Sequence, residues 1–203
     1  MRASAETIAY YDEHADDFCK STVCADMHVC LEEFLSYLPV QGLILDAGCG
    51  SGRDSRYLLD RGYQVEACDA SKEICAWAEK HIGIPVSCFS FEEMEIREKY
   101  DGIWACASLL HVAAADMEDV FFRLCRALKT GGILYASFKY GEGERIKDGR
   151  HFTDYTENAL KRLAGKTGFS VMKCFLTQDV RAEYKEQKWV NLIAGKEKLC
   201  ALV

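Results

Sequence analysis

The chain has 203 residues, of which 49% are hydrophobic and 28% charged, proportions that are ordinary for a globular protein with its own core. The formal net charge of −7 argues against affinity built on neutralising many phosphates and leaves room only for a small basic patch for one tRNA or peptide. Nucleic acid is therefore not an expected partner. A membrane is not expected either, because no apolar run reaches transmembrane length and residues 1–10 lack the apolar core of a signal peptide. Eleven cysteines at largely apolar positions indicate free thiols in a reducing, cytoplasmic location.

Helices are predicted at the start of the chain and then alternate with strands. A helical leader occupies residues 1–38, with one short helix over 4–20 and an amphipathic helix over 26–38 that Pro39 and Gly42 end. Strands are predicted at 43–47, 63–68, 86–91, 102–107, 133–138, 169–177 and 189–194. Helices are predicted at 53–61, after an N-cap at Ser71, at 116–129 and at 156–165.

This alternation predicts a single α/β domain over residues 1–203, with a doubly wound, seven-stranded and mostly parallel sheet covered on both faces. The last two strands have no helical pattern between them, which indicates an antiparallel edge strand. The polar stretch at 139–155 is long for a connection, and we expect it to be a substrate lid or wall. Arg150, His151 and Tyr155 are its candidate substrate residues, and a solvated loop is the alternative.

The most informative segment is a glycine turn at residues 46–53, Asp-Ala-Gly-Cys-Gly-Ser-Gly-Arg, which follows a short apolar strand. Gly48, Gly50 and Gly52 can adopt positive φ and let a ligand approach the backbone. The free N–H groups of the following helix point into the same space. The turn therefore predicts a binding site for a nucleoside-like cofactor.

The residues around the turn narrow that cofactor. A dinucleotide fingerprint would need a third glycine where Arg53 or Ser55 stands. Asp46 would repel a phosphate but could bind an amine, and Asp69, at the end of the next strand, could accept both hydroxyls of a ribose. S-adenosylmethionine has a ribose and a positively charged amino-acid tail and lacks phosphate, so it fits these constraints.

The motif at 46–52, together with Asp69 and with Gly131-Gly132 before the fifth strand, resembles the class I S-adenosylmethionine-dependent methyltransferases, which have a Rossmann-like fold. Within that group the chain is similar to the small tellurite-resistance-type methyltransferases. The resemblance implies cofactor contacts at Asp46, Gly48, Cys49, Gly50, Arg53, Asp69, Ala70 and Ser71. It further implies adenine contacts at Phe91 and Glu92, methionine contacts at Ala105, Cys106 and Ala107, and a covering role for Tyr11, for which plain packing is the alternative.

The expected reaction is methyl transfer to a small-molecule acceptor. A soft sulfur, selenium or tellurium nucleophile needs no base, whereas an oxygen or a protonated nitrogen does. His111, just past the fourth strand, is the candidate base, and a structural histidine is the alternative. A non-catalytic regulator that binds the cofactor, a methyltransferase for macromolecules and a nicotinamide-dependent oxidoreductase are competing hypotheses.

Two kinds of site are disfavoured by the sequence. The fourth strand is followed by Ala107-Ser108-Leu109-Leu110, not by the (Asp/Asn)-Pro-Pro-(Tyr/Phe) motif of enzymes that methylate base amino groups, and no Pro-Cys dipeptide occurs. Cys19, Cys24 and Cys30 contain no Cys-x2-Cys pair, so no metal site is expected.

Overall fold

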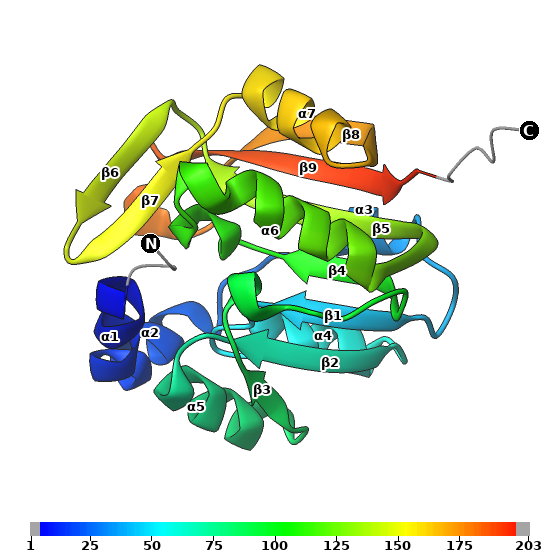
Figure 1. The fold of residues 1–203 in the computed structure, drawn as a ribbon. Coiled ribbons are helices and arrows are strands. Elements are labelled where there is room, and N and C mark those ends of the chain that lie inside the picture. The colour runs from blue at the N-terminus through cyan, green and yellow to red at the C-terminus, as the bar shows by residue number, and fades with distance from the viewer. Residues whose placement is uncertain (1–4, 198–203) are drawn as a thin grey trace, which may run out of the picture.

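A computed structural model describes residues 5–197 of the chain. Its main sheet has seven strands in the order β3-β2-β1-β4-β5-β9-β8 (Figure 1). The strands are β1 (Leu43–Ala47), β2 (Gln64–Asp69), β3 (Val86–Cys88), β4 (Tyr100–Ala105), β5 (Leu128–Lys139), β8 (Phe169–Gln178) and β9 (Lys188–Lys196). Strands β1 to β5 are parallel, and β9 pairs antiparallel with both β5 and β8. The predicted seven-stranded, mostly parallel sheet with an antiparallel end is confirmed, and the reversed strand lies one position in from the edge.

Helices cover both faces of this sheet (Figure 1). They are α1 (Ala5–Glu13), α2 (Ala15–Thr22), α3 (His28–Leu35), α4 (Arg53–Asp60), α5 (Lys72–Ile82), α6 (Ala114–Ala127) and α7 (Glu157–Lys166). Single-turn 3₁₀ helices are η1 (Phe91–Glu93), η2 (Leu109–His111) and η3 (Ala182–Tyr184).

Alternating residues of the central strands supply the two halves of the core. Leu45 and Leu134 pack with the apolar faces of α6 and α7. Ile44 and Tyr135, each one residue away from these in its strand, pack with α3 and Leu58 of α4 on the opposite face. This is the two-sided burial that the strand period of two requires when helices cover both faces of a sheet.

Four segments differ from the sequence-based expectation. The single helix expected over 4–20 is divided at His14 into α1 and α2, and the fifth strand begins at Leu128 instead of residue 133, so that Gly131-Gly132 lies within it. The third strand ends at Cys88 instead of residue 91, because a capping box between Ser90 and Glu93 starts η1 there. The polar stretch at 139–155 is not a loop but contains a second, two-stranded sheet, formed by β6 (Gly143–Lys147) and β7 (Arg150–Asp154). Its turn consists of Asp148 and Gly149, both at positive φ, which is the Asp-Gly hairpin signal.

The ends of the parallel strands and the peripheral elements meet on one side of the molecule. In Figure 1 the arrowheads of β1 and β2 point toward the side where α1, α2 and the β6–β7 hairpin lie. Helix α1 is joined to the hairpin by a hydrogen bond from the His151 N–H to Thr7 Oγ1 at 3.0 Å. The strand ends are therefore covered by the N-terminal helices from one direction and by the hairpin from the other.

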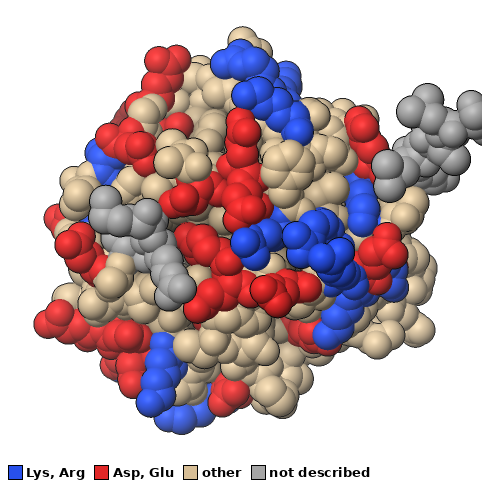
Figure 2. Space-filling model, in the orientation of Figure 1, with Lys and Arg blue, Asp and Glu red and all other residues tan. Residues whose placement is uncertain are grey.

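The molecular surface carries both charges. Figure 2 shows acidic and basic groups on the face seen in Figure 1, with the basic side chains gathered in several groups that have acidic side chains beside them. Among the helices of residues 5–197, none combines the length and the apolar character that crossing a membrane requires.

Candidate active site

The glycine turn is held in shape by the strand beside it. The carbonyl oxygen of Cys68 accepts hydrogen bonds from the N–H groups of Gly48 and Cys49 at 2.8 and 2.9 Å. Gly48 has φ +77°, and a Cβ on it would overlap the Ser108 side chain. The turn lies against the start of the segment after β4, so no other residue type fits this position without displacing its neighbours.

Asp69 fixes the next part of the turn. One carboxylate oxygen accepts from the Gly50 N–H at 3.1 Å, and the other accepts from the Ser71 N–H at 3.0 Å. Burial raises the pKa of Asp69, while the N–H donors of Ser71 and Gly50 oppose that rise. The carboxylate also faces the cavity described below. Each oxygen has a second lone pair, so a ligand hydroxyl can still bind there.

Asp46 and Asp54 form a buried acidic pair below the turn. Ser55 Oγ donates to Asp46 Oδ2 at 2.6 Å. Asp54 accepts two hydrogen bonds from the Arg53 guanidinium, at 2.7 and 2.8 Å, and one from Trp104 Nε1 at 2.8 Å. Burial and the neighbouring Asp54 raise the pKa of Asp46. A cationic ligand group near Asp46 would relieve both effects.

A cavity of about 640 Å³ extends from the glycine turn to the hairpin. Most of the sequence-predicted site residues line it. They are Tyr11, Asp46, Gly48, Cys49, Gly50, Arg53, Asp69, Ala70, Ser71, Phe91, Cys106, Ala107, His111 and Arg150. The structure thus brings most of the predicted cofactor residues, the candidate base and one predicted substrate residue around one cavity.

Four predicted site residues are not part of the lining: Glu92, Ala105, His151 and Tyr155. Ala105 is buried in the core, and the Tyr155 ring packs on Phe138 with ring centroids 4.8 Å apart. Glu92 follows Phe91 in η1 but does not line the cavity.

His151 is excluded by its position in the hairpin. Successive residues of a strand point to opposite faces, so Arg150 and Phe152 of β7 face the cavity while the His151 side chain turns toward Thr153 and Glu144. This alternation could not be applied from the sequence, because no strand was predicted within this segment.

His111 lies where three elements meet. Its Nδ1 is 2.7 Å from the His151 carbonyl oxygen, and because a carbonyl only accepts, Nδ1 carries the proton. Its Nε2 is 2.8 Å from the Tyr11 hydroxyl, which donates to it. Burial lowers the pKa of His111 to about 4. The ring is therefore neutral at neutral pH, with both nitrogens in hydrogen bonds.

Sequence reasoning missed part of the far end of the cavity. Residues 177–181, Tyr184, Gln187, Trp189 and Asn191 line it from the β8–β9 end of the sheet. The antiparallel last strand could have pointed to these residues, because a reversed strand begins at the end of the sheet where its parallel neighbours finish. Lys139, in the predicted lid, and Phe152 also line the cavity. Among residues 5–197, no three His, Cys, Asp or Glu side chains form a group that could hold a metal ion.

Comparison with known proteins finds relatives of the central segment. Residues 44–132 match a family model described as "Methyltransferase domain". The ubiquinone biosynthesis O-methyltransferase of Nitrobacter winogradskyi is 37% identical over 100 residues, which are 46% of this chain and 37% of that protein. YqeM of Bacillus subtilis is 30% identical over 117 residues, 52% of this chain and 47% of that protein. The chain therefore spans less than half the length of these two curated relatives.

The fold match covers much more of the chain. A crystal structure of the Burkholderia thailandensis 1,6-didemethyltoxoflavin-N1-methyltransferase, with bound 1,6-didemethyltoxoflavin and S-adenosylhomocysteine, aligns with a TM-score of 0.81 at 20% identity, over 96% of this chain and 89% of that chain. Residues 44–132 thus match a methyltransferase domain, within a chain that has the Rossmann-like fold of that solved methyltransferase structure.

Proposed function

We propose that the chain is an S-adenosylmethionine-dependent methyltransferase that acts on a small-molecule acceptor. One observation carries this proposal: a single cavity of about 640 Å³ joins the glycine turn and Asp69 to a second compartment lined by His111, Lys139 and Arg150. A binding protein without catalysis needs the first compartment only. The second supports an acceptor beside the cofactor.

The first compartment has the chemistry that the cofactor requires. Asp69 would accept hydrogen bonds from its ribose, and the acidic pair of Asp46 and Asp54 suits its positively charged amino group. A Cβ on Gly50 would meet the Phe18 ring at 3.4 Å, so the glycine lets the turn and α2 lie close together. The cofactor, when bound, supplies an electrophilic methyl group on a sulfonium sulfur.

The protein's own contribution is to enclose the acceptor. Tyr11 of α1 lies over the cavity and bonds to His111, and Phe152 of the hairpin packs against the His111 ring with centroids 5.0 Å apart. Contacts of this kind hold the acceptor in line with the methyl group and exclude water.

The state of His111 bears on the acceptor atom. A ring whose pKa is about 4 and whose Nε2 already accepts from Tyr11 is a weak base at neutral pH. This supports an acceptor that has no proton to lose. Soft sulfur, selenium and tellurium nucleophiles, in keeping with the tellurite-resistance-type resemblance, and groups that are already ionised both qualify.

We further propose that the protein works in a reducing compartment such as the cytoplasm. The ten cysteines within residues 5–197 are all free thiols. Disulfides are rare in such compartments, and most of these thiols are wholly or partly buried and serve as small apolar side chains.

Transfer of a labelled methyl group tests the proposed function. The purified protein is incubated with methyl-labelled S-adenosylmethionine and, separately, with the low-molecular-weight and the macromolecular fraction of a cell extract. We expect label in the small molecules and none in protein or nucleic acid. Binding of S-adenosylhomocysteine without transfer to either fraction would favour a regulator instead, and label in macromolecules would overturn the proposed acceptor class.

A further inference from the structure

Acidic and basic side chains are distributed unevenly along the cavity, although Arg53 lies beside Asp54 at the glycine-turn end and Asp148 and Asp179 lie at the other end. The carboxylates of Asp46, Asp54 and Asp69 lie at the glycine-turn end. Lys139 and Arg150 lie at the other end, at the close of β5 and the start of β7. Because β4 separates β1 from β5, the two ends are two strand spacings apart, about 10 Å across the sheet.

Lys139 is a half-buried cation without a matching anion. Its Nζ lies 4.4 Å from the centre of the Phe152 ring, and among residues 5–197 no carboxylate oxygen comes within ion-pair distance of it. Burial lowers the pKa of Lys139, and the guanidinium of Arg145 lowers it further, while Asp154 opposes the shift. Asp154 itself is paired with Arg145.

Arg150 is the second cation of this group and is also incompletely paired. Its buried Nε has no hydrogen-bond partner among the described residues. Its Nη2 is 3.6 Å from Asp148, whose side chain is 62% exposed, so this pairing is weakened by solvent. Its guanidinium lies 4.5 Å from the centre of the Tyr10 ring.

Arg181, another cation that lines the cavity, differs from Lys139 and Arg150 in being fully paired. Arg181 also lines the cavity, but Asp179 accepts from its Nε and Nη2 at 2.9 and 2.8 Å. The charge of Arg181 is thus balanced within the chain, whereas Lys139 has no ion pair among the described residues and Arg150 has only the solvent-exposed one with Asp148.

We propose that the methyl acceptor is a small organic anion whose charged group binds between Lys139 and Arg150. Its apolar part would lie against Trp189, which lines the cavity and is the partner of Lys139 in the β5–β9 register. A carboxylate or an ionised hydroxyl or thiol has the required charge and can accept a charge-assisted hydrogen bond from each cation. Both cations lie near the Phe152 ring, with Lys139 Nζ 4.4 Å and Arg150 Cζ 5.5 Å from its centre. The inference rests on the proposed function and makes it more specific. It also agrees with a neutral His111, since an ionised acceptor arrives with no proton to remove.

Binding of matched acids and amides tests the inference without turnover. Benzoate and benzamide, then hexanoate and hexanamide, are titrated by calorimetry into the protein saturated with S-adenosylhomocysteine. We expect at least one acid to bind at least about tenfold more tightly than its amide, because only the acid satisfies both cations. Lys139→Met and Arg150→Gln should each reduce that preference to about threefold or less.

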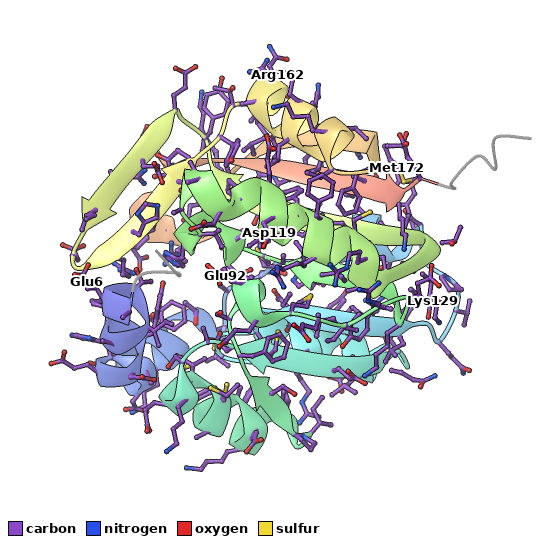
Figure 3. All side chains as sticks on the ribbon, in the orientation of Figure 1. Glu6, Glu92, Asp119, Lys129, Arg162 and Met172 are labelled. Atoms are coloured by element: carbon purple, nitrogen blue, oxygen red, sulfur yellow. The ribbon has the colours of Figure 1, made fainter. Side chains whose placement is uncertain are left out.

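Lys129→Met is the matched control. Lys129 is in the same strand as Lys139 but at its opposite end, where it pairs with Asp101, and Figure 3 shows it far from the hairpin side. This variant should keep the full preference for the acid. Unchanged affinity for S-adenosylhomocysteine verifies that each variant is folded, and Arg150→Gln decides alone if Lys139→Met does not fold.

The outcomes separate the inference from the function on which it rests. If the wild-type protein does not bind S-adenosylhomocysteine, the proposed function fails. If it does, but neither acid binds better than its amide, or the preference survives both substitutions, the anionic acceptor is wrong and the methyltransferase assignment stands.

Discussion

Side chains at the glycine turn serve the backbone as well as the ligand. The carboxylate of Asp69 accepts from the N–H groups of Gly50 and Ser71 and still faces the cavity. The hydroxyl of Ser71 accepts from the Ile74 N–H as an N-cap and donates to Asp12 of α1. A change at either residue therefore affects the shape of the turn and the ligand contacts together.

Asp69→Asn should weaken binding of S-adenosylhomocysteine by about 10- to 100-fold, because an amide has one acceptor oxygen and cannot accept from both N–H groups and the ribose. Calorimetry measures the effect. Asp119→Asn, on the exposed side of α6 where Asp119 pairs with Arg123, is the control and should bind normally. Equal affinity of Asp69→Asn and the wild type would refute the ribose assignment.

His111 predicts a dependence of stability on pH. Burial lowers its pKa in the folded protein to about 4, below the ordinary 6.5, so protonation favours the unfolded chain. The contribution of the neutral His111 ring to the free energy of unfolding is complete above about pH 6.5, and it is lost as the pH falls toward 4. It is on the order of 2–3 kcal/mol, since the ring keeps part of its contact with solvent.

Urea unfolding at several pH values measures this contribution. His111→Gln should lose less free energy of unfolding than the wild type on acidification, because glutamine does not titrate. Parallel curves for the two proteins would show that the histidine is not buried in its neutral form.

At the scale of elements, helix α1 is attached to the rest of the molecule through a few individual side chains. It contacts the cavity through Tyr11 and the hairpin through Thr7, and it rests on α5 through Asp12. It contributes only Thr7 as a buried residue. A helix held mainly by polar contacts opens more readily than the core strands.

Tyr11→Phe should increase hydrogen exchange of the α1 amides by at least about fivefold, since it removes the hydroxyl that donates to His111 and leaves that nitrogen without its partner. Tyr10→Phe is the control, because the Tyr10 hydroxyl has no hydrogen bond within the described residues. Amides of β4 should be unaffected in both. If α1 of Tyr11→Phe keeps wild-type protection, the hydroxyl does not fasten the helix.

Elements with a strong local signal were predicted well. Strand β1 begins and ends where the apolar run at 43–47 placed it, and Ser71 caps α5 as expected. The β6–β7 hairpin was missed because its strands are largely polar and β6 is mostly exposed, so hydrophobic periodicity did not mark them. Asp148-Gly149 was the available signal, and it specifies turn geometry rather than burial.

The same physical reason limits prediction of the site. The glycine turn and Asp69 carry a local signal, alternating glycines and an acid that each follow a predicted strand, and could be identified from the sequence. The anionic-acceptor end requires Lys139, Arg150 and Trp189 from three elements to converge, which depends on the sheet order and on the face of each strand. Those are properties of tertiary packing, and a single sequence does not display them.

At the scale of the whole molecule, the core on the α6 side sets stability. Phe121 is fully buried, with its ring centroid 6.1 Å from that of Phe169, while its neighbour Phe122 is 47% exposed. The two adjacent residues offer the same chemical change in opposite environments.

Phe121→Ala should lower the free energy of unfolding by about 3–5 kcal/mol, because it removes buried apolar surface and leaves a cavity. Phe122→Ala should change it by less than about 1 kcal/mol. Urea unfolding at neutral pH measures both values. Similar losses in the two variants would contradict the burial of Phe121.

The sheet order also dictates when this protein can finish folding. Strand β9, the last in sequence, lies between β5 and β8, so those two strands have no direct partner in each other. Until residues 188–196 have left the ribosome, β5 and β8 each keep an unpaired edge, which is a template for intermolecular pairing. Nascent chains halted before β9 should therefore aggregate or bind chaperones, while chains that include it should not.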